Sequence, residues 1–210
     1  MNKESLLKLI AQKGYDISYS ANLNFATYDI VKKFPKYVSF ISIFIGVLGL
    51  AFPSFTRVIV SILVLLLGVL CLFVDRYVDN IEVFAEFGKK ETEYVNRLKA
   101  LYYDVKDGCI DNVIAKKQFY SIVEDFNSSS NPNHICGSEC FAHYKLFCKK
   151  DFLWMDEQIH FHWWRDKVPS SLKIGIIALF FVAVSVMVCV FFYRFFTIAV
   201  NFMPLMKNVC

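Results

Sequence analysis

The most constraining feature of the sequence is a pair of adjacent stretches that contain no charged residue. The first covers 20 residues between Lys36 and Arg57, and the second covers 17 residues between Arg57 and Asp75. Crossing a hydrocarbon core of about 30 Å takes roughly 20 apolar residues, and about 17 is the lower limit. Each stretch is therefore long enough for a transmembrane helix, and together they predict a helical hairpin.

Pro53 marks the end of the first of these helices. Proline has no backbone N–H and restricts the residue before it, so we expect the helix to end near Phe52. The alternative is that both stretches are core helices of a soluble protein. A chain of 210 residues has too little surrounding sequence to cover two uncharged helices and a third one like them. The membrane interpretation is therefore favoured.

A third uncharged stretch of 20 residues runs from Ile174 to Tyr193. The expected fold is an all-α membrane protein with a transmembrane hairpin, a cytoplasmic helical bundle and a third, C-terminal transmembrane helix. Apolar sequence continues beyond Arg194. The alternative is therefore that the C-terminal end lies on the membrane or re-enters it, with Arg194 snorkelling or facing a pore. The expected segments are N-terminal helices (1–36), the hairpin (37–74), a helical domain (75–170) and the third helix with a tail (171–210).

The distribution of lysines predicts the orientation of the hairpin. Residues 1–36 contain six lysines and three acidic residues, whereas the hairpin turn contains only Arg57. Positively charged segments stay in the cytoplasm, so we expect the N-terminus and the central domain there and the turn outside. The charged N-terminus lacks the apolar core of a signal peptide, and the first transmembrane helix is expected to direct insertion. A disulfide framework is not expected for the seven cysteines.

Apolar periodicity and capping residues predict the helices of the soluble part. We expect a helix that ends at Gly14, one that begins at Asp16, and a long amphipathic helix that continues the second transmembrane helix and ends at Gly108. The expected ranges are 5–13, 16–33, 75–107, 111–126, and from Ser138 to before Pro169, with a loop over 127–134. The helix over 111–126 is expected to bury Val113, Ile114, Phe119, Ile122, Val123 and Phe126.

Small residues follow one face of each hairpin helix. They are Ser39, Ser42, Gly46 and Gly49 in the first helix, and Ser61 and Gly68 in the second. Small residues allow helices in lipid to approach closely. The face serves either packing within one hairpin or assembly with other copies, including the lining of a pore. Arg57 and Arg194 are the candidate charges at such a pore or at the membrane interface.

One cluster has the composition of a metal site. His134, Cys136, Cys140, His143 and Cys148 offer nitrogen and sulfur donors, of which zinc needs four. The spacing lacks the paired CxxC of typical zinc sites, so structural cysteines are favoured and no metal is predicted.

Glu157 and His160 are helix neighbours of the kind that acid–base catalysis uses. They lack a nucleophile and the HExxH motif, which favours a salt-bridged helix face. The sequence has no phosphate-binding or dinucleotide-binding loop. A net charge of +4 without a basic stripe does not indicate nucleic-acid binding. We therefore predict no enzyme activity, no cofactor and no direct binding of nucleic acid.

Short motifs around the hairpin carry a resemblance to a known family. LLKLIAQKGYDI and FATYDIVKKFP precede the hairpin, and YKLF, WMDEQIHF and RDKVP follow it. In this order, over about residues 5–170, they resemble the SLATT domains, the SMODS and SLOG-associating two-transmembrane effectors of bacterial defence.

The resemblance implies a bacterial inner-membrane effector against phage, with no catalytic residues. It implies a homo-oligomer that disrupts the membrane in an abortive infection. A nucleotide second-messenger synthase or a reverse transcriptase is the implied partner, and membrane lipid is the expected surrounding. The alternatives are a scaffold that anchors a defence complex without forming a pore, and a membrane-bound enzyme that uses Glu157, His160 or the Cys/His cluster.

Overall fold

The computed structural model describes residues 2–53, 57–129, 133–149, 152–162, 166, 173–181, 184, 185 and 187. The chain divides into two compact units, Met1–Lys167 and Val168–Cys210. Every regular element in the described part of the chain is helical, which confirms the all-α class. The elements of the first unit are α1 (Lys3–Ala51), α2 (Val58–Asp75), a short 3₁₀ turn η2 (Val78–Asn80), α3 (Ile81–Asp107), α4 (Asn112–Asn127), α5 (Ser138–Tyr144), a π-helical turn η3 (Lys145–Lys149) and α6 (Leu153–Ile159).

Helix α1 is a single helix of 49 residues that joins the N-terminal segment to the hairpin. The prediction of two separate N-terminal helices was wrong, because Gly14 and Asp16 both lie inside α1. Gly14 does not end a helix here. It makes room for Trp154, whose Cη2 atom would lie only 2.4 Å from a Cβ at this position. Burial of the large indole ring outweighs the cost of a glycine inside a helix, about 1 kcal/mol.

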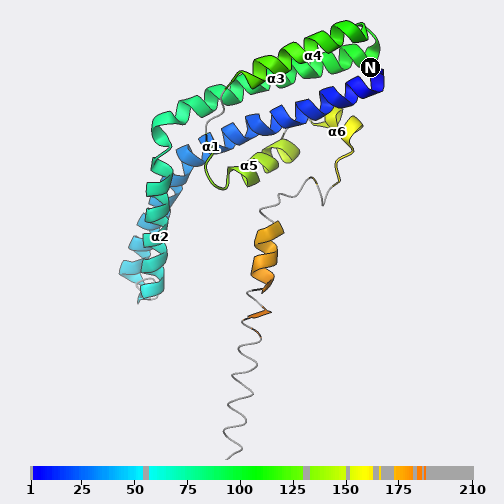
Figure 1. The fold of residues 1–210 in the computed structure, drawn as a ribbon. Coiled ribbons are helices and arrows are strands. Elements are labelled where there is room, and N and C mark those ends of the chain that lie inside the picture. Colours follow the sequence, from blue (N-terminus) through cyan, green and yellow to red (C-terminus); the bar gives the residue numbers. More distant parts are fainter. Residues whose placement is uncertain are drawn as a thin grey trace, which may run out of the picture. The chain divides into compact units, whose positions relative to one another are not determined.

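The membrane end of α1 agrees with the prediction from Pro53. The helix ends at Ala51, and the N–H of Phe52 donates to the carbonyl oxygen of Leu48 at 2.8 Å. Figure 1 shows α1 changing direction where it leaves the bundle and runs beside α2. Pro35 lies inside this helix and removes one backbone hydrogen bond, a common cause of helix bending.

The second stretch forms α2, which confirms the predicted hairpin of two apolar helices. The prediction that α2 continues into the next helix was wrong, because a turn at Arg76 and Tyr77 and the η2 turn separate α2 from α3. The break lets α3 fold back along α1, as Figure 1 shows. At this corner, where the hairpin meets the bundle, Val74 packs in a small buried cluster with Val31 and Ile135.

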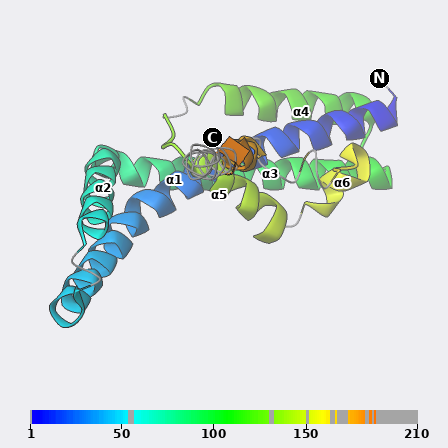
Figure 2. The same cartoon turned by 90° about the horizontal axis from the view of Figure 1, so that it is seen from below.

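Helices α3, α4 and α6 pack around the N-terminal part of α1, and α5 and η3 also contact α1. In both views α4 lies on one side of α1 and α6 on the other (Figures 1 and 2). Their shared core contains Trp154 and Tyr102, whose ring centroids lie 5.4 Å apart, and the fully buried Leu6, Ile10 and Leu98. The bundle therefore buries its own apolar side chains.

Helix α4 has the predicted boundaries and a partly different buried face. Gly108 ends α3 with a φ of +75°, and an Asp111 carboxylate oxygen accepts from the N–H of Val113 at 3.1 Å. The prediction that Val113 and Ile114 are buried was wrong, since they are 75% and 54% exposed. A narrower stripe faces the core, with the spacing of four and three that one helix face requires. It consists of Ala115, Phe119 and Ile122.

The prediction of one long helix from Ser138 to before Pro169 was also wrong. This part of the chain forms α5, the π-helical turn η3 and α6 in succession. The left-handed residues Gly137 and His160 bound it, with φ values of +88° and +54°. Trp154, in α6, is buried against Gly14 of α1. Trp163 and Trp164 lie outside the described residues.

In the second unit, residues 173–181 and residues 184, 185 and 187 are helical. The hydroxyl of Ser185 donates to the carbonyl oxygen of Phe181 at 2.6 Å, four residues earlier, as on a helix surface. The rest of the expected third transmembrane helix and Arg194 lie outside the described residues.

Candidate functional site

The surface of the hairpin is apolar and uncovered. In the most apolar 18 residues of α1 and of α2, only 6% of the residues are buried. Large side chains such as Phe40 and Leu72, each 70% exposed, project from the two helices. Apolar surface in water costs about 25 cal/mol per Å². A surface this extensive therefore requires lipid or another apolar partner.

Small residues of both helices line a groove of about 560 Å³ in this surface. The structure brings together four of the six small residues of the predicted face, whereas Ser39 and Gly68 do not line the groove. The four are Ser42, Gly46, Gly49 and Ser61. A Cβ added at Gly46 would meet nothing within 4 Å. The contact of α1 with α2 therefore does not require glycine at this position.

Arg57 stands at the turn of the hairpin. It is the N-cap residue of α2, and it is exposed. It lies between the apolar part of α1 and that of α2. A cation at such a turn is expected to stay at the membrane–water interface while the two helices cross the membrane.

A buried carboxylate joins α3 to α1 in the bundle. Glu91 is 1% exposed, and its two oxygens accept hydrogen bonds from the Ser20 hydroxyl and the Asn24 amide, both at 2.8 Å. Burial raises the pKa of Glu91, although the two hydrogen bonds act in the opposite direction. Sequence reasoning missed this site. The available signal was the run of polar residues on α1 whose spacing matches a buried helix face.

Replacement of Glu91 by alanine is expected to destabilise the α1–α3 contact by about 2–3 kcal/mol, because it removes both hydrogen bonds of this buried carboxylate, to Ser20 and to Asn24. Glu91→Gln keeps the shape and should cost less than about 1 kcal/mol.

The raised pKa of Glu91 also predicts a pH dependence. The wild-type contact should weaken as the pH rises from the ordinary pKa of a glutamate through the pKa of Glu91 in the folded protein, and Glu91→Gln should lack this dependence. Amide hydrogen exchange of α3 in the full chain measures both effects. Equal losses in the two variants would contradict this role.

The two histidines of the Cys/His cluster, which was only a weak candidate for a metal site, contact other groups. The His134 Nδ1 atom lies 3.4 Å from the Thr27 hydroxyl, and burial lowers the pKa of His134. The His143 Nε2 atom lies 2.7 Å from the carbonyl oxygen of Asp166. Cys136 and Cys148 are exposed, and Cys140 is partly buried. Within the described part of the chain, no three His, Cys, Asp or Glu side chains come close enough together to hold a metal ion.

Glu157 has a structural role between α6 and α3. It accepts hydrogen bonds from the Tyr102 hydroxyl at 2.9 Å and from the Lys106 ammonium at 2.6 Å. The hydrogen bond from Lys106, with that from Tyr102, holds the pKa of Glu157 below its ordinary value. A general acid or base at neutral pH needs the opposite shift. His160, its expected partner, is exposed at the end of α6.

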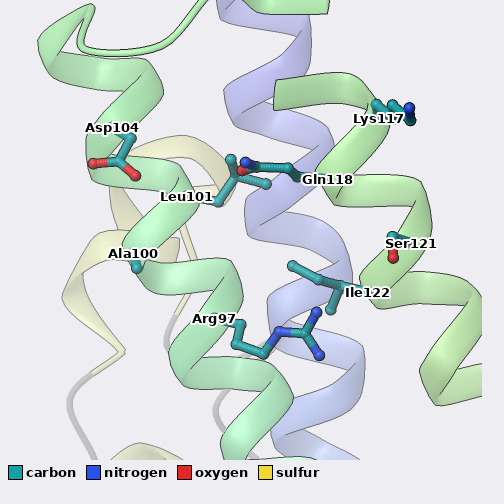
Figure 3. A pocket seen from close by; sticks show the side chains of 8 residues that line it. All are labelled: Arg97, Ala100, Leu101, Asp104, Lys117, Gln118, Ser121 and Ile122. Carbon is teal, nitrogen blue, oxygen red and sulfur yellow. The ribbon is translucent and has the colours of Figure 1, made fainter. Parts of the chain in front are cut away.

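A second groove, of about 500 Å³, lies between α3 and α4. Figure 3 shows the side chains of Arg97 and Gln118 pointing across the gap between the two helices. Arg97 is paired with Asp125 at 3.2 Å, and Asp104 and Lys117 also line the groove. Its mixed charges do not select a ligand class.

Comparison with known proteins identifies a family. Residues 1–188 match the family model described as SMODS and SLOG-associating 2TM effector domain 6. No curated protein and no solved structure matches the chain. The matched residues include the whole bundle and the hairpin, and two transmembrane helices agree with the two apolar helices α1 and α2.

Proposed function

The chain belongs to the family of SMODS and SLOG-associating two-transmembrane effector domains of bacterial defence, and from this premise we propose that it permeabilises the inner membrane as an oligomer. A signal in the cytoplasm triggers this activity during phage infection and leads to abortive infection. The family name links such domains to nucleotide signalling. The proposed trigger is therefore a second-messenger synthase or its product, or a reverse transcriptase partner.

The observation that carries this proposal is the continuity of α1. One helix packs in the bundle through residues such as Asn24 and lines the hairpin groove through Gly46. A rearrangement of the bundle therefore moves the groove directly, without a flexible linker between them. Such a helix offers a mechanical route from a cytoplasmic signal to the bilayer.

The proposed assembly uses the groove between α1 and α2. Its small residues, Ser42, Gly46, Gly49 and Ser61, leave space that another apolar helix can enter. Close packing of small residues is a main source of helix association in lipid. The entering helix comes from another copy of the hairpin. Separately, we propose the C-terminal segment as a third transmembrane helix.

We place the N-terminus and the bundle in the cytoplasm, because residues 1–36 carry six lysines and three acidic residues. The turn with Arg57 then lies outside, and Arg194 lies near the outer interface. Arg57 and Arg194 are the charges that we propose near the mouth of a pore. No catalytic residue and no cofactor belongs to this proposal.

Induction of the full chain in bacteria tests the function. We expect loss of membrane potential and dye entry before growth stops, with a detergent-extracted mass several times 24.4 kDa. Intact potential and dye exclusion in cells that stop growing would contradict permeabilisation. Co-purification of a polymerase, without leakage, would instead indicate the scaffold.

A further inference from the structure

A pocket of about 380 Å³ lies where α1 leaves the bundle for the hairpin. Side chains of α1 form one wall, and side chains of α5 and η3 form the other. They include Asp29, Lys33 and Tyr37 on α1, and Phe141 and Lys145 opposite them. Tyr37 is the first residue of the uncharged stretch, and Asp29 lies about 12 Å earlier along the helix. The pocket therefore extends from the charged base of the bundle to the level where the apolar surface begins.

Two lysines share one aspartate at this pocket. The Lys145 ammonium donates to the Asp29 carboxylate and to the carbonyl oxygen of Phe25 at 3.1 Å, and Lys33 pairs with Asp29 at 2.8 Å. Burial acts to raise the pKa of Asp29, but the hydrogen bonds from Lys145 and Lys33 outweigh it and hold the pKa below its ordinary value. Asp29 is therefore ionised at neutral pH. The three groups together carry one net positive charge.

Donors of this cluster remain available to a ligand. An ammonium group has three N–H donors. Lys33 uses one of them within the described part of the chain, and its side chain is 57% exposed, whereas that of Lys145 is only 16% exposed. Lys145 thus holds the cluster in place, and Lys33 presents free N–H groups at the opening.

The opening has an aromatic rim. Tyr37, Phe141 and Tyr144 line the pocket and are 64%, 49% and 52% exposed. Exposed aromatic rings next to lysines, at the end of an apolar stretch, are typical of the interface between headgroups and acyl chains. A lipid that enters here places its acyl chains along the exposed apolar face of the hairpin.

We propose that this pocket binds the phosphate headgroup of an anionic phospholipid, with Lys33 as the contact at the opening. A single net charge suits one phosphate diester better than a soluble polyphosphate. The apolar rim also favours a lipid over a free anion. The lipid would fix the depth of α1 against α5, and this binding is separate from permeabilisation because it requires no pore.

Native mass spectrometry of the full chain in detergent tests the proposal, with phosphatidylglycerol or phosphatidylcholine added. We expect retained phosphatidylglycerol to exceed phosphatidylcholine and Lys33→Gln to weaken its retention about fivefold, as the loss of one lysine contact predicts. Lys32→Gln is the charge-matched control. The Lys32 ammonium lies 4.7 Å from the centroid of the Tyr28 ring, and this residue does not line the pocket.

Two results would overturn the proposal. Equal losses in Lys33→Gln and Lys32→Gln would mean that only overall charge attracts the lipid. If the two lipids were retained equally and inorganic phosphate were retained through Lys33 instead, the pocket would be a site for a soluble anion. Neither result depends on leakage, so a failure here is distinct from a failure of the proposed effector function.

Discussion

Replacement of Gly46 by leucine is expected to abolish most of the membrane permeabilisation while the protein still folds. A Cβ at Gly46 meets nothing within 4 Å, so the first atom of the new side chain fits without a clash inside the hairpin. It does enter the groove that Gly46 shares with Ser61 and fills the space for another helix. Close packing of small residues is a main source of helix association in lipid, so we expect assembly to weaken about tenfold, which corresponds to about 1.4 kcal/mol. Dye release and the mass in detergent should both fall.

Ala51→Leu is the matched control for this experiment. It adds the same side chain to the same helix, but Ala51 is exposed and does not line the groove. We expect this variant to assemble and permeabilise as the wild type does. If Gly46→Leu also assembled and killed cells normally, the groove would not be the assembly surface. If both variants lost activity, added bulk on the hairpin would be the cause.

The second large effect is expected at Trp154, the largest fully buried side chain in the described part of the chain. It packs on Gly14 of α1 and on the Tyr102 ring. Trp154→Ala should destabilise the bundle by about 3–5 kcal/mol, because it removes a large apolar side chain and leaves a cavity. Amide hydrogen exchange in the N-terminal part of α1 should accelerate, whereas exchange in the hairpin should stay slow.

A double-mutant cycle separates the fit of Gly14 from ordinary helix propensity. Gly14→Ala alone should cost about 1–3 kcal/mol, because the new Cβ would lie 2.4 Å from the indole ring. In the Trp154→Ala background the clash is absent, and the same change should stabilise α1 by up to about 1 kcal/mol. A Gly14→Ala cost that is equal in both backgrounds would show that the close packing of Gly14 and Trp154 is unimportant.

The boundaries of the hairpin were predictable because local chemistry determines them. Charges at Lys36, Arg57 and Asp75 bound the apolar stretches, and Pro53 ends the first helix. Gly108, at the end of α3, is another local signal, since a left-handed φ favours glycine. Such signals need no knowledge of the rest of the chain.

The continuity of α1 could not be predicted in the same way. Gly14 reads as a helix end until Trp154, 140 residues later, is known to pack against it. The break between α2 and α3 likewise depends on the packing of α3 against α1. Local propensity is a weak guide where tertiary packing decides, and these positions are examples.

The candidate sites, too, were predictable where local sequence determines them and not where they depend on tertiary packing. The small residues of the hairpin were visible as a face, but only the structure separates the four that line the groove from Ser39 and Gly68. Glu91 looked like one more charge on an amphipathic helix. Its burial against Ser20 and Asn24 follows from the pairing of two helices that are far apart in sequence. The lipid pocket also combines residues from distant segments.

Release of an encapsulated dye from liposomes is the most direct test of the central proposal. The purified full chain is incorporated into vesicles of bacterial lipid at increasing protein-to-lipid ratios, so that assembly is favoured by mass action. We predict release that rises more steeply than linearly with protein, and that falls about tenfold with Gly46→Leu but not with Ala51→Leu. Vesicles that retain their dye at every ratio, with the protein fully inserted and assembled, would contradict a membrane-permeabilising effector.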